Sequence, residues 1–226
     1  DPPSVDEFEE LARFSGLPEL PRHSQLHALN IRRVALQVAQ TLNRDVRDCH
    51  FVIAHLGGGI SVCAMSKGRM IDVNNANNGG PFSPERAAGL PAGPLLRLCF
   101  SGQFTEEQLK EKLLRRAGLL GYLGTNDGRE IEERISRGDK YAELIYQALG
   151  YQVVKEIGAM GAVLPLIDGL IFTGGLAHSD MLIKFITSYV SYLGPIFRIP
   201  GENELMALVE GATRALLGQE EIKEYI

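Results

Sequence analysis

The sequence predicts an α/β fold in which helices flank a mixed β-sheet. Three short apolar runs, separated by two tight turns, follow one another between residues 51 and 73, and this order is typical of an antiparallel meander. Further along the chain, the patterns alternate as strand, helix, strand and helix, which indicates parallel connections. Antiparallel and parallel strands together make a mixed sheet.

The first half of the chain is expected to hold the meander between helical segments. A helix is expected over residues 27–43, because apolar side chains recur there at helical spacing. A shorter helical segment is expected over residues 5–14. The segment Ser83-Pro84-Glu85-Arg86 predicts a helix start, since proline is favoured in the first helical turn. The strands of the meander are expected over residues 51–56, 60–65 and 70–73.

The second half is expected to be mostly helical. Thr105 and Gln108 have the spacing of a capping box, which opens a helix. The longest helix is expected to start near Asp139, because apolar residues then recur on one face. That stripe consists of Ile145, Leu149, Val153, Ile157, Met160 and Leu164. The other elements are expected at residues 129–137 (helix), 169–173 (strand), 179–192 (helix), 196–199 (strand) and 204–217 (helix).

Residues 157–177 have the apolar composition of a membrane-spanning segment, because Asp168 is the only charged residue among them. A spanning helix needs about 20 consecutive apolar residues in one helical segment, whereas this stretch contains Pro165 and five glycines. We therefore interpret it as the end of a buried helix, a turn and a buried strand, and we expect no membrane association.

Composition and charge exclude several classes of protein. The 226 residues are 45% hydrophobic and 23% charged, as in an ordinary globular protein and unlike a disordered one. The net charge is -5 and the sequence has no strongly basic block, which argues against a dedicated nucleic-acid-binding protein. Cys49, Cys63 and Cys99 are scattered, without the spacing of a disulfide framework, which favours a cytoplasmic protein.

The strongest candidate site is the segment His55-Leu56-Gly57-Gly58-Gly59-Ile60-Ser61, which lies between two predicted strands. Consecutive glycines allow backbone N–H groups to point into one concavity, and such a nest binds phosphate oxygens without side chains. Ser61 would add a hydroxyl group, and His55 stands at the end of the strand. The alternative is a glycine-rich hairpin without a ligand, although a tight turn needs only one or two glycines.

A second candidate is Phe172-Thr173-Gly174-Gly175-Leu176-Ala177, in which a buried strand runs through two glycines into a helix. Nucleotides commonly dock at such a junction, where helix N–H groups face an open sheet edge. The alternative is an ordinary turn between a strand and a helix.

Several separated motifs occur together in the order of a known family. They are Val5-Asp6-Glu7, Leu26-His27-Ala28-Leu29-Asn30, His55 to Ser61, Ile71-Asp72-Val73-Asn74-Asn75, Phe82-Ser83-Pro84-Glu85-Arg86 and Phe172 to His178. On these motifs, residues 1–217 resemble the butyrate kinases, within the acetate kinase family of acyl-phosphate-forming kinases. The resemblance implies the ribonuclease H-like fold of actin, Hsp70 and the sugar kinases, with a mixed sheet flanked by helices.

The resemblance also implies a division of the chain. Residues 46–203 would form a nucleotide-binding lobe, and residues 1–45 a helical segment that bridges to an N-terminal lobe. Residues 204–226 would form a C-terminal helix that packs on that N-terminal lobe. Members of the family begin with such a lobe, which carries a phosphate loop. We expect the N-terminal lobe to lie outside this chain, and the chain by itself to be inactive.

Individual residues take roles from the same resemblance. Arg86 and His27 would contact the transferring phosphoryl group, and Asp6 would be a third catalytic residue. Asn75 would orient the substrate, and Glu204 would lie near Mg²⁺. The nucleotide is expected at His55, Gly57, Gly58, Gly59, Ser61, Asp127, Gly128, Arg129, Gly174 and Gly175.

Plainer alternatives remain for several of these residues. The alternative for Arg86 is a solvated arginine, and for His27 it is a helix-start histidine bonded to a backbone carbonyl. Asp127 can also be part of an ordinary Asp-Gly turn. Two of the acidic site residues have alternatives: Asp1 could take the place of Asp6, and Glu202 that of Glu204.

The reaction implied by the resemblance converts ATP and a short-chain fatty acid of the butyrate type into ADP and an acyl phosphate, reversibly and with Mg²⁺. The expected partners are the nucleotide, the carboxylic acid and further copies of the chain in a homodimer or larger homo-oligomer. Two alternatives are a non-catalytic nucleotide-binding module of the same fold and a kinase that acts on a hydroxyl substrate. The second would need a general base, usually an aspartate.

Overall fold

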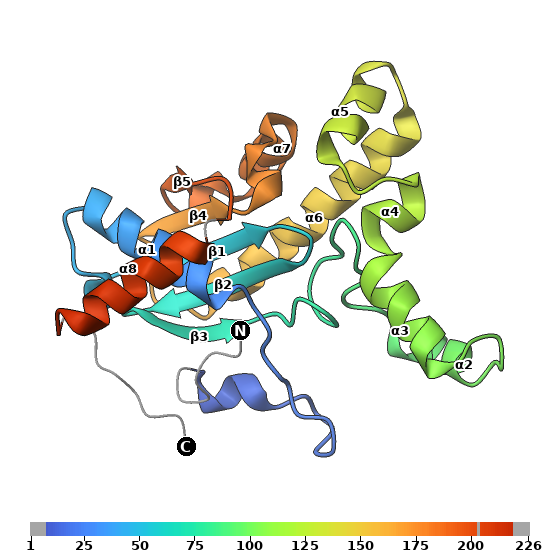
Figure 1. Ribbon diagram of the computed structural model, residues 1–226, viewed down its shortest axis with the longest axis horizontal. Coiled ribbons are helices and arrows are strands. Elements are labelled where there is room, and N and C mark those ends of the chain that lie inside the picture. The colour runs from blue at the N-terminus through green and yellow to red at the C-terminus, as the bar shows by residue number, and fades with distance from the viewer. Residues whose placement is uncertain (1–7, 203, 219–226) are drawn as a thin grey trace.

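The centre of the molecule is a five-stranded sheet of order β3-β2-β1-β4-β5 (Figure 1). The computed structural model describes residues 8–202 and 204–218. The strands β1, β2 and β3 pair antiparallel, whereas β4 and β5 add to β1 in parallel, so the predicted mixed sheet is confirmed. The strands are β1 (His50–Leu56), β2 (Ile60–Ser66), β3 (Arg69–Val73), β4 (Gly169–Thr173) and β5 (Ile196–Arg198).

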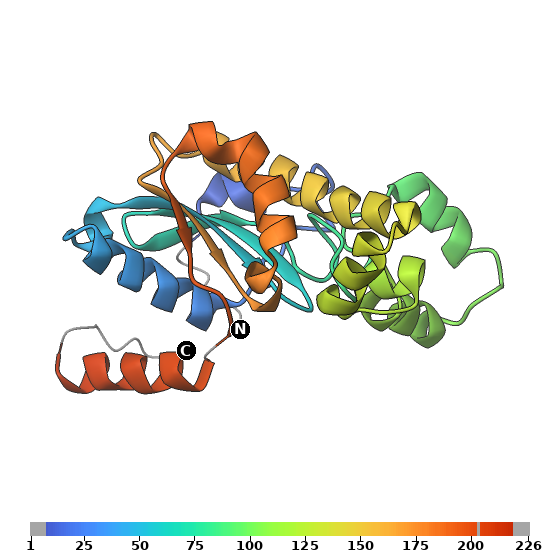
Figure 2. The same cartoon turned by 90° about the horizontal axis from the view of Figure 1, so that it is seen from above.

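Helices cover both faces of the sheet. The helix α1 lies on one face, and α6 and α7 lie on the other (Figure 2). Helices α2 to α5 stand together beyond one end of the sheet (Figure 1). The helices are α1 (Ala28–Thr41), α2 (Ala92–Cys99), α3 (Glu106–Arg115), α4 (Gly118–Leu123), α5 (Gly128–Ser136), α6 (Lys140–Ala162), α7 (Asp180–Val190) and α8 (Glu204–Leu216).

The central strand β1 is buried along its whole length. Successive side chains of a strand point to opposite faces. Phe51 and Ile53 accordingly pack with α1, and Val52 and Ala54 pack with α6 and α7. The same alternation directs His55 to the face that α1 covers, and this decides its surroundings in the candidate site.

The main helical predictions are confirmed. Asp139 caps α6 by accepting a hydrogen bond from the Ala142 N–H at 2.9 Å. Thr105 and Gln108 form the predicted capping box at the start of α3. Every residue of the predicted stripe from Ile145 to Leu164 is buried in the core between α6 and the sheet.

The apolar stretch over residues 157–177 is divided as predicted. It contains the end of α6, a loop, β4 and the short 3₁₀ helix η3 (Gly175–His178). In the part of the chain that the structure describes, no helix is both long and apolar enough to cross a membrane.

The predicted helix start at Ser83 is wrong. The segment forms a closed turn, in which the Ser83 N–H donates to the Arg86 carbonyl at 3.0 Å. A helix would need the carbonyls of Ser83 and Pro84 to accept from residues four places further on. They accept instead from the N–H groups of Leu119 and Leu120 in α4, at 3.1 and 2.9 Å. Long-range partners therefore replace the local helical bonds.

The helix predicted over residues 5–14 is also wrong for residues 8–14, the part of it that the structure describes. From residue 8 onward, this segment contains a single 3₁₀ turn, η1 (Glu10–Arg13). Just before that turn, the Glu9 N–H donates to the Ile71 carbonyl of the edge strand β3 at 3.0 Å. This backbone bond to the edge of the sheet takes the place of a bond within a local helix.

Candidate functional site

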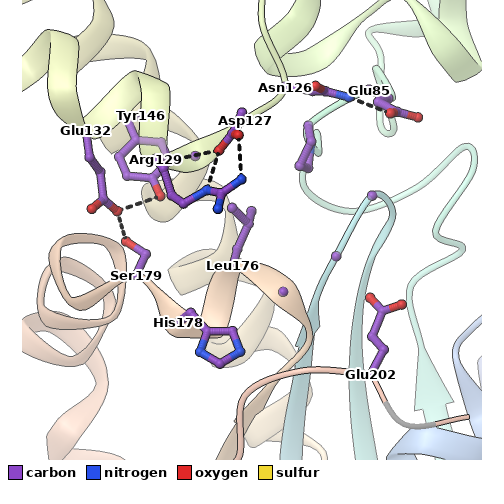
Figure 3. A pocket seen from close by; sticks show the side chains of 15 residues that line it. Glu85, Asn126, Asp127, Arg129, Glu132, Tyr146, Leu176, His178, Ser179 and Glu202 are labelled. Carbon is purple, nitrogen blue, oxygen red and sulfur yellow. Dashed lines mark hydrogen bonds and ion pairs between the residues drawn. The ribbon is translucent and has the colours of Figure 1, made fainter.

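A pocket of about 640 Å³ lies where the ends of β1 and β4 meet the loop before α5. Three segments that are far apart in the sequence line it, and each was predicted to bind nucleotide. From these segments the structure brings together Gly57, Gly58, Asp127, Gly128, Arg129 and Gly175. Figure 3 shows the labelled side chains of the lining arranged around this space. The sequence motifs therefore form one cavity.

Two charged side chains lie close to the glycine hairpin between β1 and β2. A Cβ atom on Gly57 would collide with the Glu202 carboxylate, and one on Gly59 would collide with the Arg86 guanidinium. Gly58 faces open space in the pocket. None of the three adopts a positive φ, and the Gly57 N–H donates to the Gly59 carbonyl at 3.2 Å. The hairpin is thus a tight, side-chain-free wall, with the N–H of Gly57 already bonded within it.

The two glycines after β4 have different functions. Gly174 has a φ of 87°, and a Cβ there would lie 2.6–2.8 Å from backbone atoms of Leu56. Gly175 lines the pocket, and a Cβ on it would meet nothing within 4 Å. Glycine is therefore required at position 174 by the backbone, whereas Gly175 leaves this part of the pocket wall without a side chain.

The segment Asp127 to Arg129 forms the rim of the pocket and the start of α5. Asp127 caps this helix by accepting from the Arg129 N–H at 2.9 Å. It also holds the Arg129 guanidinium with two further bonds, at 3.2 and 2.9 Å. These side-chain bonds, and next the backbone bond, keep the pKa of Asp127 below its ordinary value. Gly128 lines the pocket beside the hydroxyl of Tyr146.

Sequence reasoning missed a polar group on the far wall of the pocket. Glu132 accepts hydrogen bonds from the hydroxyls of Tyr146, at 3.2 Å, and Ser179. All three side chains line the cavity (Figure 3). Burial raises the pKa of the Tyr146 hydroxyl, which keeps it protonated as a donor. Glu132 could have been found from its place one helical turn after Gly128, since residues four apart share a helix face.

His27 and His55 form a stacked pair behind the glycine hairpin. Their ring centroids are 3.7 Å apart, and the rings are 9° from parallel. His27 Nδ1 lies 2.9 Å from the Ser61 hydroxyl, and His55 Nε2 lies 2.8 Å from a carboxylate oxygen of Glu202. His55 and Ser61 are fully buried and do not line the pocket. The structure places them beneath it, where they contact residues nearer to the open space.

His27 is expected to remain neutral across the physiological pH range. Burial, and next the adjacent His55 ring, lowers the pKa of His27 to about 3. An unfolded histidine titrates near 6.5, so between pH 6.5 and about 3 only the unfolded chain takes up this proton. Stability conferred by His27 should therefore fall as the pH falls through that window.

Nuclear magnetic resonance of the His27 ring protons tests this prediction. Their chemical shift should stay constant from pH 8 down to pH 4, with the His27→Gln variant identifying the signal. A midpoint near pH 6.5 would show that the imidazole is solvated and that the buried pair is wrongly described.

Arg86 reaches from the turn after Phe82 to the glycine hairpin. Its Nη1 atom donates to the Ala76 carbonyl at 3.3 Å, and its guanidinium covers Gly59. Its positive charge is among the smaller influences that lower the pKa of His27. Arg86 therefore lies against the hairpin and His27 against Ser61 and His55 beside it, and neither residue lines the pocket.

The remaining predicted site residues lie elsewhere or are not described. The Asn75 amide donates to the His23 carbonyl at 2.7 Å, and Asn75 lines a second cavity of about 770 Å³. Asp6 lies outside the described residues. Glu204 begins α8, but its side chain is not described. The roles of these three residues remain predictions.

Most of the chain matches the sequences of known proteins. A family model described as the acetokinase family matches residues 22–196. The chain belongs to the acetokinase family. A member described as probable butyrate kinase 2 of Caldanaerobacter subterraneus subsp. tengcongensis is 50% identical over 226 residues. Butyrate kinase 2 of Clostridium acetobutylicum is 48% identical over 227 residues. The chain is covered completely in both matches, and it spans 64% of each of these acetokinase relatives.

Solved structures of acetokinase type share the fold. An acetate kinase of Porphyromonas gingivalis superposes with a TM-score of 0.82 at 21% identity, over 91% of this chain and 60% of that one. A propionate kinase of Francisella tularensis superposes with a TM-score of 0.79 at 21% identity, over 88% of this chain and 59% of that one. These matches confirm the predicted fold class.

Proposed function

We propose that this chain is the nucleotide-binding part of an ATP-dependent carboxylate kinase of the butyrate kinase type. The reaction transfers a phosphoryl group from ATP to a short-chain fatty acid, which gives ADP and an acyl phosphate, and it is reversible. The observation that carries the proposal is the single pocket built by the glycine hairpin, the Asp127–Arg129 segment and Gly175, with Arg86 and His27 behind the hairpin. The names of the two relatives support the choice of a fatty acid.

The pocket suggests how the nucleotide is oriented. The phosphates are assigned to the glycine hairpin, because a wall without side chains admits them and the Arg86 guanidinium adjoins it. The nucleoside is assigned to the opposite wall, where Glu132 lies across the pocket from Glu202 (Figure 3). There, a carboxylate held by two hydroxyl groups offers acceptors for hydroxyl or amino groups of the ligand.

The proposed chemistry needs positioning rather than a strong base. A carboxylate substrate is already an anionic nucleophile, so no proton must be removed. The main requirement is to hold two anions together and to stabilise the charge on the moving phosphoryl group. Arg86 supplies a planar set of donors for phosphoryl oxygens, and neutral His27 supplies an N–H donor.

Mg²⁺ is part of the proposal, as the resemblance implies. Within residues 8–202 and 204–218, no group of three or more His, Cys, Asp or Glu residues could hold a metal ion. Mg²⁺ in proteins typically uses one or two protein carboxylates together with water and substrate phosphates. Asp6 and Glu204 are the carboxylates proposed to hold it. When bound, it would neutralise phosphate charge.

We further propose the division of the chain given above and a homodimer or larger homo-oligomer. Several apolar side chains of α8 are exposed, which supports the proposal that the C-terminal segment packs on another part of the protein. These are Leu205, Leu208, Val209 and Leu216. Such a stripe on an amphipathic helix usually packs on further protein. Light scattering of the full protein would measure the oligomeric state.

The test is a kinase assay of the full protein with ATP, Mg²⁺ and a panel of substrates. Acyl phosphate should be trapped by hydroxylamine from short-chain fatty acids, with sugars and other alcohols inactive. Phosphorylation of an alcohol instead would favour the hydroxyl kinase. Nucleotide binding without turnover on any substrate would favour the non-catalytic module.

A further inference from the structure

Three neighbouring strands present polar side chains side by side beneath the start of α1. His55 on β1 is paired in register with Ser61 on β2 and with Thr173 on β4. Residues paired across strands point to the same face of a sheet. All three side chains are fully buried. His27 and Asn30, at the start of α1, lie over these three side chains and form hydrogen bonds with them.

The orientation of the Asn30 amide follows from its neighbours. The Thr173 hydroxyl donates its hydrogen to the Gly201 carbonyl at 3.2 Å. Its oxygen can therefore only accept from Asn30, and the group that lies 2.9 Å away must be the amide nitrogen. The same nitrogen lies 3.0 Å from His55 Nδ1. An NH₂ group has two hydrogens, so one goes to Thr173 and the other to His55.

This arrangement determines where His55 carries its proton. Because Asn30 donates to Nδ1, that atom must be the unprotonated acceptor of the ring. The proton of the neutral imidazole is then on Nε2, which lies 2.8 Å from the Glu202 carboxylate and donates to it. This hydrogen bond is the main reason that the pKa of Glu202 is below its ordinary value.

We propose that Asn30 is a positioning residue that holds His55 in the Nε2–H tautomer, so that His55 orients Glu202 at the wall of the pocket. Asn30 is 2% exposed and is not expected to touch a ligand, so it acts only through His55. Thr173 assists by fixing the amide. The inference rests on the proposed function for its effect on turnover, whereas the tautomer is a property of the chain itself.

The same network ties the Glu202 loop to the sheet. The Gly201 carbonyl accepts a hydrogen bond from the Thr173 hydroxyl, and Gly201 forms a backbone bridge with Gly174. Glu202 follows directly and lines the pocket. A change of tautomer would place the bare Nε2 lone pair against the carboxylate, which repels it. Glu202 would then turn away from its position beside Gly57.

Nitrogen-15 resonance of the His55 ring in the full protein tests the inference directly, with His55→Gln identifying the signal. The wild type should show a protonated Nε2 and a bare Nδ1. In Asn30→Asp, the new carboxylate accepts from Nδ1, so that nitrogen should change to the protonated signal. Thr173→Val should mix the two tautomers, and Thr173→Ser, which keeps the hydroxyl, should restore the wild-type spectrum.

Turnover gives a second readout. Asn30→Asp should lower kcat/KM for the nucleotide by about 10- to 100-fold, as loss of an outer hydrogen-bonding partner commonly does. The matched control is Asn43→Asp, which adds the same charge at an exposed position beyond the end of α1 and should leave turnover unchanged.

Two results would overturn the inference: a protonated Nδ1 in the wild type, or a wild-type tautomer retained in both Asn30→Asp and Thr173→Val. The wild-type spectrum decides even if a variant fails to fold. If the wild type makes no acyl phosphate at all, the proposed function fails, whereas the spectrum still decides the assignment of the tautomer.

Discussion

Replacing Arg86 by alanine is expected to lower kcat by about 100- to 1,000-fold, the usual cost of removing a donor aimed at developing charge. The Arg86 guanidinium covers Gly59 at the hairpin and is tethered to the Ala76 carbonyl. Under the proposed function, Arg86 would act on the transferring group at the hairpin, while the nucleoside would be held on the opposite wall. Nucleotide affinity should therefore change much less than turnover. Steady-state kinetics with butyrate and MgATP, together with calorimetric titration of MgADP, separate the two effects.

The controls for this prediction distinguish geometry from charge. Arg97→Ala removes an arginine from the exposed helix α2, and turnover should not change. Arg86→Lys keeps the charge but loses the planar set of donors, so it should recover only part of the activity. Near-normal turnover of Arg86→Ala would remove Arg86 from the reaction.

Introducing glutamate at Gly175 is expected to weaken nucleotide binding by about 100-fold, because in the proposed site the new side chain fills pocket space and brings a negative charge close to the anionic nucleotide, where like charges cost several kcal/mol. Gly175 lines the pocket, its backbone is ordinary, and a Cβ would meet nothing within 4 Å. The folded structure should therefore be kept. Titration with MgADP and a thermal unfolding curve measure the two properties on the same sample.

Two other glycines make the result interpretable. Gly158→Glu puts the same side chain at an exposed helical position with open space, and binding should not change. Gly174 is unsuitable for this test. Even alanine there would lie against the Leu56 backbone at a φ of 87°, so Gly174→Ala should lower the thermal midpoint. Unchanged binding by Gly175→Glu would contradict the assignment of the pocket to the nucleotide.

The elements that could be predicted are those determined by local patterns. The meander, the capping box of α3 and the long helix from Asp139 all depend on residues a few positions apart. The turn at Ser83 failed for the opposite reason: its carbonyls bond to α4, more than 30 residues away along the chain. Proline in a favourable position cannot reveal such a partner.

The candidate site divides in the same way. The glycine hairpin, the Asp127–Arg129 segment and Gly175 could be found as motifs, because phosphate and nucleotide sites need glycine in recognisable places. Glu132 could be found only from its place one helical turn after Gly128, and Tyr146 could not be found from a motif. Tyr146 belongs to the buried face of α6, and only the packing of that helix places its hydroxyl against Glu132.

The sequence by itself determined the fold class, the family and the segments that form the pocket, because these depend on short-range patterns and ordered motifs. Only the tertiary structure decided which side chains face the pocket and which support them from beneath. His55 and Ser61 belong to the strongest motif, yet strand register and the alternation of side chains turn both toward α1. Their chemistry is set by Asn30, Thr173 and Glu202, whose approach depends on packing between distant elements.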